Sequence, residues 1–175
     1  EDLRQSKRKY LIDHLMKPAE RLKIEICDNV GRQMIDGILP PLAISEEEVT
    51  IYTTYKFEFD GRWVNFENPH MTYRQFNDIM RHFLKQEFAA SDKYNSIFKC
   101  INSAIDKSGI DRRDIDYILL IGGRSYNPYI QYALKENFSN STLRIPHDLQ
   151  THVSQGAAIH SLIYNGLGHN VINPI

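Results

Sequence analysis

Cysteine is scarce in this sequence of 175 residues. Cys27 and Cys100 are the only two, and they form no C-x-x-C pair. Neither a zinc site nor a disulfide framework is therefore indicated. The histidines give no metal site either, because His147, His152 and His160 lack the i, i+4 spacing that places two ligands on one helix face. We expect no metal ligands in the chain and a reducing, cytoplasmic compartment.

Long apolar runs and an excess of one charge are also lacking. No stretch approaches the roughly 18 apolar residues that span a bilayer, and no charged-then-apolar signal segment opens the chain. The formal net charge is -1 and the pI is about 6.7, which gives no electrostatic support for binding nucleic acid or a membrane surface. The basic run Lys7–Lys9 and the acidic run Glu46–Glu48 are typical of solvated faces. We expect a soluble globular protein with neither nucleic-acid nor membrane partners.

The first third of the chain predicts a helix followed by a hairpin. Apolar residues recur there at spacings of 4, 4, 3 and 4, which is one stripe of an amphipathic helix: Leu11, Leu15, Ala19, Leu22 and Ile26. Pro18 either kinks this helix or begins a second one. Two runs typical of strands then flank the turn Asp60-Gly61. The chain starts inside the helical pattern and stops at VINPI, so we expect a piece of a longer protein.

The rest of the chain alternates helices with short strands. Thr72 and Gln75 have capping-box spacing, and Phe76, Ile79, Met80, Phe83 and Leu84 supply the core face of the helix they begin. Another helix follows and ends before Gly109. From Ser91 onward the order is helix, buried strand, glycine-rich turn, helix, strand and helix. This order predicts an α/β fold with a largely parallel sheet, preceded by a smaller α+β lobe.

The stretch IDYILLIGGRSYNPYIQ, from Ile115 to Gln131, carries the strongest functional signal. Its apolar run Tyr117–Ile121 predicts a strand that is covered on both faces. Gly122 and Gly123 follow, where the backbone can adopt positive φ and a ligand can approach without meeting a Cβ. Asn127 and Pro128 then suit the start of a helix. Such a turn presents backbone N–H groups to an anion, although a tight packed turn gives the same pattern. The stretch lacks the dinucleotide fingerprint G-x-G-x-x-G.

A second candidate group lies on the first helix. Glu20, Lys23 and Cys27 have i, i+3, i+7 spacing, which places them on one stripe beside the apolar face. A carboxylate and an ammonium there could hydrogen-bond a ribose or a purine. A surface ion pair between Glu20 and Lys23 explains the same spacing and stays open as the alternative.

Three stretches of the sequence can be compared with a known family by their order and spacing: PAERLKIEI (Pro18–Ile26), IDYILLIGGRSYNPYIQYAL (Ile115–Leu134) and SQGAAIHSLI (Ser154–Ile163). Together they resemble the second lobe of the ATPase domain of the DnaK-type 70-kilodalton heat-shock chaperones. The resemblance runs from about Arg8 to Gly166 and is poor between Asp28 and Pro69. It implies an actin-like ATPase (ribonuclease H-like) fold. Residues 1–88 would form the small subdomain IIB, and residues 89–175 the C-terminal half of subdomain IIA.

The resemblance also implies a role in binding adenosine nucleotides. Glu20 and Lys23 match family residues that bond the ribose and adenine, and Gly122 and Gly123 match the diglycine turn beneath the nucleotide.

This chain departs from the family at four positions, which we still count with the nucleotide site. Cys27 and Arg124 stand where the family has serine, and Gln150 stands where it has aspartate. Tyr126 replaces an arginine that stacks on adenine. The tyrosine ring can still stack, but the cation is lost.

The resemblance implies that ATP or ADP, with Mg²⁺ in the longer parent, is the cofactor of a stress-response chaperone that assists protein folding. The family's phosphate-binding loops, catalytic lysine and metal-organising aspartates are absent from these residues, so we expect no catalytic residue here and no ATP hydrolysis by this piece alone. Implied partners are lobe I of the same parent, a nucleotide-exchange factor and a J-domain cochaperone. The alternative is a nucleotide-silent relative that acts as a protein-interaction module.

Overall fold

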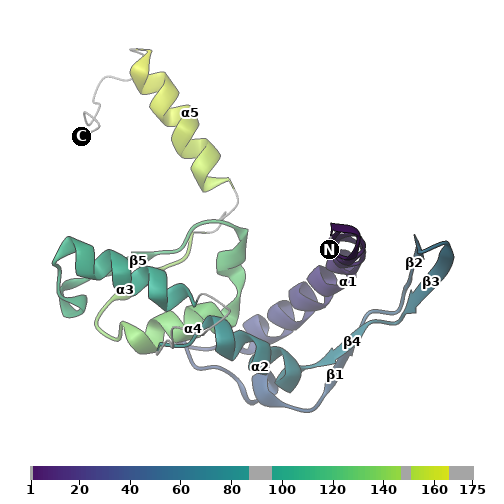
Figure 1. Cartoon of the computed structure of the whole chain (residues 1–175). Coiled ribbons are helices and arrows are strands. Elements are labelled where there is room, and N and C mark those ends of the chain that lie inside the picture. Colours follow the sequence, from purple (N-terminus) through teal and green to yellow (C-terminus); the bar gives the residue numbers. More distant parts are fainter. Residues whose placement is uncertain (1, 87–95, 147–150, 166–175) are drawn as a thin grey trace. The chain divides into compact units, whose positions relative to one another are not determined.

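The computed structural model describes residues 2–86, 96–146 and 151–165, and divides the chain into two compact units, residues 1–109 and 110–175. Each unit is described by itself. The chain is a mixed α/β protein, as the sequence predicts, with helices and three small two-stranded sheets in its described part (Figure 1). The expected division after residue 88, which follows the family's subdomains, stays a prediction.

The first unit is built on one long helix, α1 (Asp2–Gln33). Pro18 lies inside it, so the helix continues through the proline and no second helix begins there. Pro18, Ile26 and Val30 are fully buried, which lets tertiary packing offset the hydrogen bond that proline removes. Leu22 belongs to the same buried stripe. Ala19 was expected there and is exposed instead.

A β-ribbon lies along α1. Its base is the pair β1 (Glu48–Thr50) and β4 (His70–Thr72), and its outer part is the pair β2 (Thr54–Phe59) and β3 (Arg62–Glu67), both antiparallel. Asp60 and Gly61 join β2 to β3 with φ of 54° and 73°, the two positive values of a tight hairpin turn. The hairpin predicted around Asp60-Gly61 is therefore confirmed. Before the ribbon, residues Pro41–Ile44 form a 3-10 turn, η1.

Two more helices complete the first unit. In α2 (Tyr73–Phe83), Thr72 and Gln75 form the predicted capping box, and Tyr73, Phe76 and Met80 are buried. Ile79 and Phe83 were expected in the core and are 43% and 40% exposed. Helix α3 (Ile97–Ser108) begins at the cap Ser96. It ends, as its sequence predicts, at Gly109, which has a φ of 67°. Its buried anchor is Phe98.

The second unit contains a small parallel sheet, β5 (Tyr117–Leu119) beside β6 (Thr142–Arg144), with helix α4 (Pro128–Asn137) between them in sequence. The parallel pairing confirms the predicted topology. The expectation that Tyr117–Ile121 is covered on both faces is wrong for the residues described, because Tyr117, Leu119 and Ile121 are 63%, 59% and 50% exposed. Within this run only Leu120 is buried. Among the described residues, β6 is the one strand that pairs with β5, so most of the run has no cover. Helix α5 (His152–Tyr164) matches the predicted final helix.

Candidate functional site

Glu20 and Lys23 lie on successive turns of α1. Lys23 Nζ donates to Glu20 Oε1 at 3.0 Å, and the two side chains are 56% and 40% exposed for Glu20 and Lys23 respectively. The ion pair that was the alternative explanation of their spacing therefore forms. Because exposed pairs of this kind contribute only a few tenths of a kcal/mol, the contact is weak enough to exchange for a ligand.

Cys27 lies on the same helix but faces inward. Its side chain is 8% exposed, and burial raises the pKa of its thiol to about 12, with nearby Lys23 opposing and Asp28 adding to the shift. A neutral buried thiol offers little to a polar ligand. The structure therefore brings Glu20 and Lys23 together at the surface and places Cys27 in the core beside them.

The second candidate group lies where β5 ends. Gly122 has a φ of 84°, a conformation that favours glycine, and a Cβ placed on it would meet no atom within 4 Å. Residues Gly123–Tyr126 then form a 3-10 turn, η3. Asn127 follows as the cap of α4: its Oδ1 accepts from the Tyr129 N–H at 2.9 Å, and Pro128 is the first helical residue. The predicted strand, turn and capped helix are all present.

Two polar side chains that the sequence did not single out brace this turn. Ser125 Oγ donates to the Ile121 carbonyl at 2.8 Å, and Gln131 Nε2 donates to the Ser125 carbonyl at 2.7 Å. Together they hold both ends of η3, one to the strand and one to α4. No sequence signal identifies them, because serine and glutamine occur on many exposed helix faces.

The remaining predicted site residues are exposed or lie outside the described part. Arg124 is exposed, and Tyr126 is 47% exposed, so both side chains are accessible at the turn. Gln150 falls outside the residues that the structure describes. The seven candidates that the structure describes thus form two groups: Glu20, Lys23 and Cys27 in the first unit, and the turn residues in the second.

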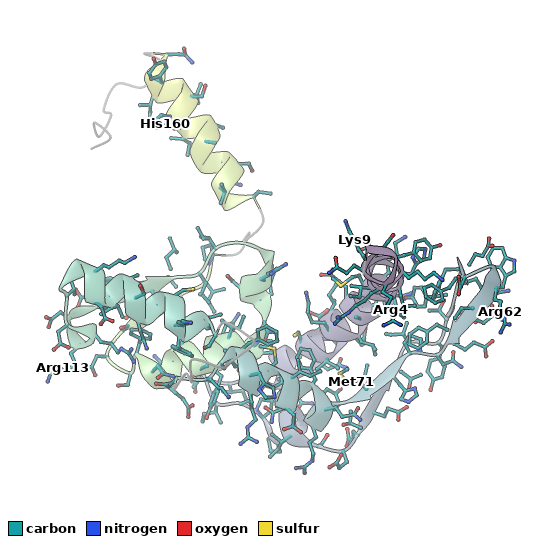
Figure 2. All side chains as sticks on the ribbon, in the orientation of Figure 1. Arg4, Lys9, Arg62, Met71, Arg113 and His160 are labelled. Atoms are coloured by element: carbon teal, nitrogen blue, oxygen red, sulfur yellow. The ribbon has the colours of Figure 1, made fainter. Side chains whose placement is uncertain are left out.

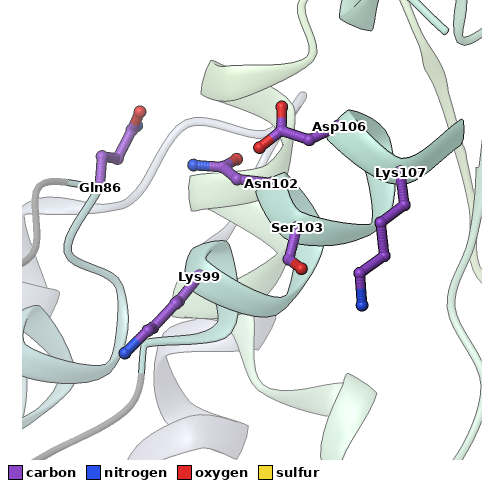
Figure 3. Close-up of a pocket in the computed structure, with 6 residues that line it drawn as sticks. All are labelled: Gln86, Lys99, Asn102, Ser103, Asp106 and Lys107. Atoms are coloured by element: carbon purple, nitrogen blue, oxygen red, sulfur yellow. The ribbon is translucent and has the colours of Figure 1, made fainter. Parts of the chain in front are cut away.

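The first unit also has a pocket, and none of the candidate residues lines it. Its volume is about 520 Å³, and it opens along one face of α3 beside Gln86 (Figure 3). The residues that line it are Gln86, Lys99, Asn102, Ser103, Asp106 and Lys107. Within the described ranges, no cluster of three or more His, Cys, Asp or Glu side chains could hold a metal ion. The helices described are also too short or too polar to cross a membrane.

Comparison with known proteins identifies relatives. The family model described as Hsp70 protein matches residues 64–172, which is more than half of the chain. A "Heat shock protein 70 homolog" of Acanthamoeba polyphaga mimivirus is 30% identical over 94 residues, which are 52% of this chain and 10% of that protein. The chain therefore spans about a tenth of the curated relative it matches. No solved structure matches it.

Proposed function

The chain belongs to the Hsp70 family, and on that basis we propose that it is the adenosine-binding part, lobe II, of the nucleotide-binding domain of a heat-shock-70-like chaperone. In this proposal residues 1–88 and 89–175 correspond to the two subdomains of that lobe. Their opening and closing with ATP or ADP controls the binding of client protein elsewhere in the parent. The parent is then an ATPase of the cytoplasm.

The observation that carries this proposal is the turn between β5 and α4. It lies inside the matched residues 64–172, and Gly122 leaves the backbone open to a ligand at a φ of 84°. A Cβ would be strained at this φ, so the glycine is required by the backbone conformation. Backbone N–H groups at such a turn suit the sugar and phosphates of a nucleotide.

Glu20 and Lys23 supply the polar contacts to the ribose and the base in this proposal. They lie before residue 64 and so outside the matched region, and their assignment rests on the stretch PAERLKIEI. Both side chains of this ion pair lie at the surface of α1. A hydroxyl or a purine nitrogen can replace one of its partners at little cost, because the pair is half exposed.

The substituted positions set the preference of the site. Tyr126 offers a ring on which adenine stacks, and Arg124 and Gln150 are the other substituted positions that we assign to the nucleotide. Cys27 acts from beneath as an apolar support, since its thiol is buried and neutral. In the parent, Mg²⁺ neutralises the phosphates when bound and is held by residues outside this chain. Lobe I, a nucleotide-exchange factor and a J-domain cochaperone are the proposed protein partners.

The proposal is tested by titrating the protein with adenosine and with ADP while amide NMR shifts are recorded. Gly123→Val places a branched side chain where backbone meets ligand, and we expect a loss of affinity of about tenfold or more. Gly31→Val is the control, because Gly31 is exposed and has open space where a Cβ would lie. Unchanged affinity in a folded Gly123→Val protein would overturn the proposal.

A second candidate function is a nucleotide-silent protein-interaction module. Large aromatic side chains on the ribbon favour it: Tyr52 is 87% exposed and Trp63 is 73% exposed. Aromatic residues of this kind are enriched at interface centres. This function predicts a partner that is retained without nucleotide and lost from a Trp63→Ala variant. Binding that requires ATP throughout would count against it.

A further inference from the structure

The β-ribbon of the first unit is interrupted between its base and its outer part. The regular register ends at the pair Thr50–His70 and resumes at the pair Thr54–Glu67. Two backbone hydrogen bonds still join the strands between these pairs, from the Ile51 N–H to the Pro69 carbonyl and from the Asn68 N–H to the Thr53 carbonyl, both at 2.9 Å. Asn68 has a φ of 45°, and Pro69 cannot donate a backbone hydrogen bond. Such breaks bend a ribbon and weaken its pairing locally. Residues 51–53 and 68–69 therefore have the geometry of a hinge.

The base of the ribbon is fixed to the core by backbone hydrogen bonds. The Tyr73 N–H donates to the Glu47 carbonyl at 3.1 Å, and the Arg74 N–H donates to the Ser45 carbonyl at 2.9 Å. Val49 beside them is 7% exposed. These contacts join β1, β4, η1 and α2 into one packed body.

The outer part, residues 54–67, is attached differently, and we call it the hairpin arm. Arg62 lies at its tip and Met71 marks the base of the ribbon (Figure 2). At the tip, Lys7 Nζ donates to Asp60 Oδ1 at 2.5 Å, with side chains that are 45% and 61% exposed. Nearer the hinge, Arg21 Nη1 donates to the Tyr55 hydroxyl at 3.4 Å.

Between these polar contacts lies a small aromatic cluster. The ring of His14 lies 4.9 Å from that of Phe57, and the rings of Tyr10 and Phe59 are 6.4 Å apart. His14 Nδ1 lies 2.9 Å from the Tyr10 carbonyl, which fixes the ring because only a protonated Nδ1 can donate there. Phe57 is the buried residue of the arm, at 5% exposure, while Tyr10 remains 42% exposed. Among the described residues, the hydrogen bonds from α1 to the arm are made by side chains alone.

From these contacts we propose that the hairpin arm is a hinged element that α1 holds closed through the cluster around His14. Four residues on one stripe of α1 contact the arm, and we call them the lock residues: Lys7, Tyr10, His14 and Arg21. Because they share one face of the helix, they contact the arm together. Release turns the arm about residues 51–53 and 68–69 and exposes Phe57 and the aromatic rings beside it. The base of the ribbon, α1 and α2 stay packed during this motion.

Hydrogen exchange of the intact protein tests the hinge. A two-stranded ribbon without packing is only marginally stable, so amides of the released arm exchange. We expect His14→Ala to speed exchange in residues 54–67 by about tenfold or more, with α2, β1 and β4 unchanged. Tyr10→Ala should act in the same segment. Asp13→Ala, at the exposed neighbouring position of α1, is the control and should leave the arm unchanged.

Two outcomes would overturn the proposal. Unchanged exchange in the arm of both His14→Ala and Tyr10→Ala would show that the aromatic cluster does not hold the arm against α1. An equal rise in the arm, α2 and the base would show that the arm unfolds with the core. A selective rise in the arm of either variant, with Asp13→Ala silent, supports the hinge.

Discussion

At the scale of single residues, the two cysteines differ in burial. Cys27 is buried in α1, and Cys100 is exposed on α3. Burial raises the pKa of Cys27 to about 12, so its reactive thiolate is nearly absent at neutral pH.

We predict that iodoacetamide modifies Cys100 and spares Cys27 at about pH 8, where a thiol with a pKa of about 12 is ionised on the order of once in ten thousand molecules. Because the folded pKa is raised, Cys27 favours the folded state fully below the unfolded thiol pKa of about 8.5 and loses this contribution as pH rises toward 12. Peptide mass spectrometry after labelling checks the prediction. Fast labelling of Cys27 in the folded protein would contradict it.

Substitution of Lys23 distinguishes a structural role of this residue from a role in binding nucleotide. Its ion pair with Glu20 is 40% to 56% exposed, so Lys23→Ala should lower the free energy of unfolding by less than about 0.5 kcal/mol. If Lys23 binds nucleotide, the same variant loses about tenfold in ADP affinity. Urea denaturation and calorimetric titration measure the two effects. Lys17→Ala, an exposed position on the same helix, is the control.

At the scale of elements, local signals predicted most of what the structure contains. The capping box at Thr72, the turn Asp60-Gly61 and the cap Asn127 were all recognisable because neighbouring residues decide them. The continuity of α1 through Pro18 could not be recognised from the sequence, because it depends on the packing that buries this proline. Burial of Tyr117–Ile121 was mispredicted for the same reason, since a strand's cover comes from other elements.

The capping box gives a prediction for α2. Thr72 Oγ1 accepts from the Gln75 N–H at 3.1 Å, and Gln75 Oε1 accepts from the Thr72 N–H at 3.0 Å. Thr72→Ala should therefore lower the free energy of unfolding by about 1 kcal/mol. Thr72→Ser keeps the cap oxygen and should recover most of the loss. Equal losses in the two variants would indicate that the threonine methyl group, and not the cap, is responsible.

At the scale of the whole molecule, the candidate nucleotide-binding residues are divided between two units, and the sequence indicates these residues but not how the units are arranged. Glu20 and Lys23 belong to residues 1–109, and Gly122 and Gly123 belong to residues 110–175. Motif spacing along the chain carries no information on how two compact units face each other. The pairing of Glu20 with Lys23 was predictable, because i, i+3 neighbours always meet on a helix.

The exposed apolar side chains of the second unit also have a consequence at this scale. Tyr117, Leu119 and Ile121 lie on one side of β5, and each is at least half exposed. The 175-residue chain alone should therefore bind a hydrophobic dye such as ANS and self-associate. Leu119→Lys should reduce both, as measured by fluorescence and light scattering. Ile12→Lys, at an exposed apolar position on α1 in the other unit, is the control and should change neither.

Helix α1 finally has a mechanical consequence. Its 32 residues make a rod of about 48 Å, with Lys7 and Tyr10 near its start and Glu20 and Lys23 past its middle. A tilt of about 10° about its C-terminal end would carry the N-terminal end through roughly 8 Å. The same tilt of α1 therefore moves Val30, near the pivot, by less than about 1 Å, and it moves Lys7 by more than the length of one helical turn.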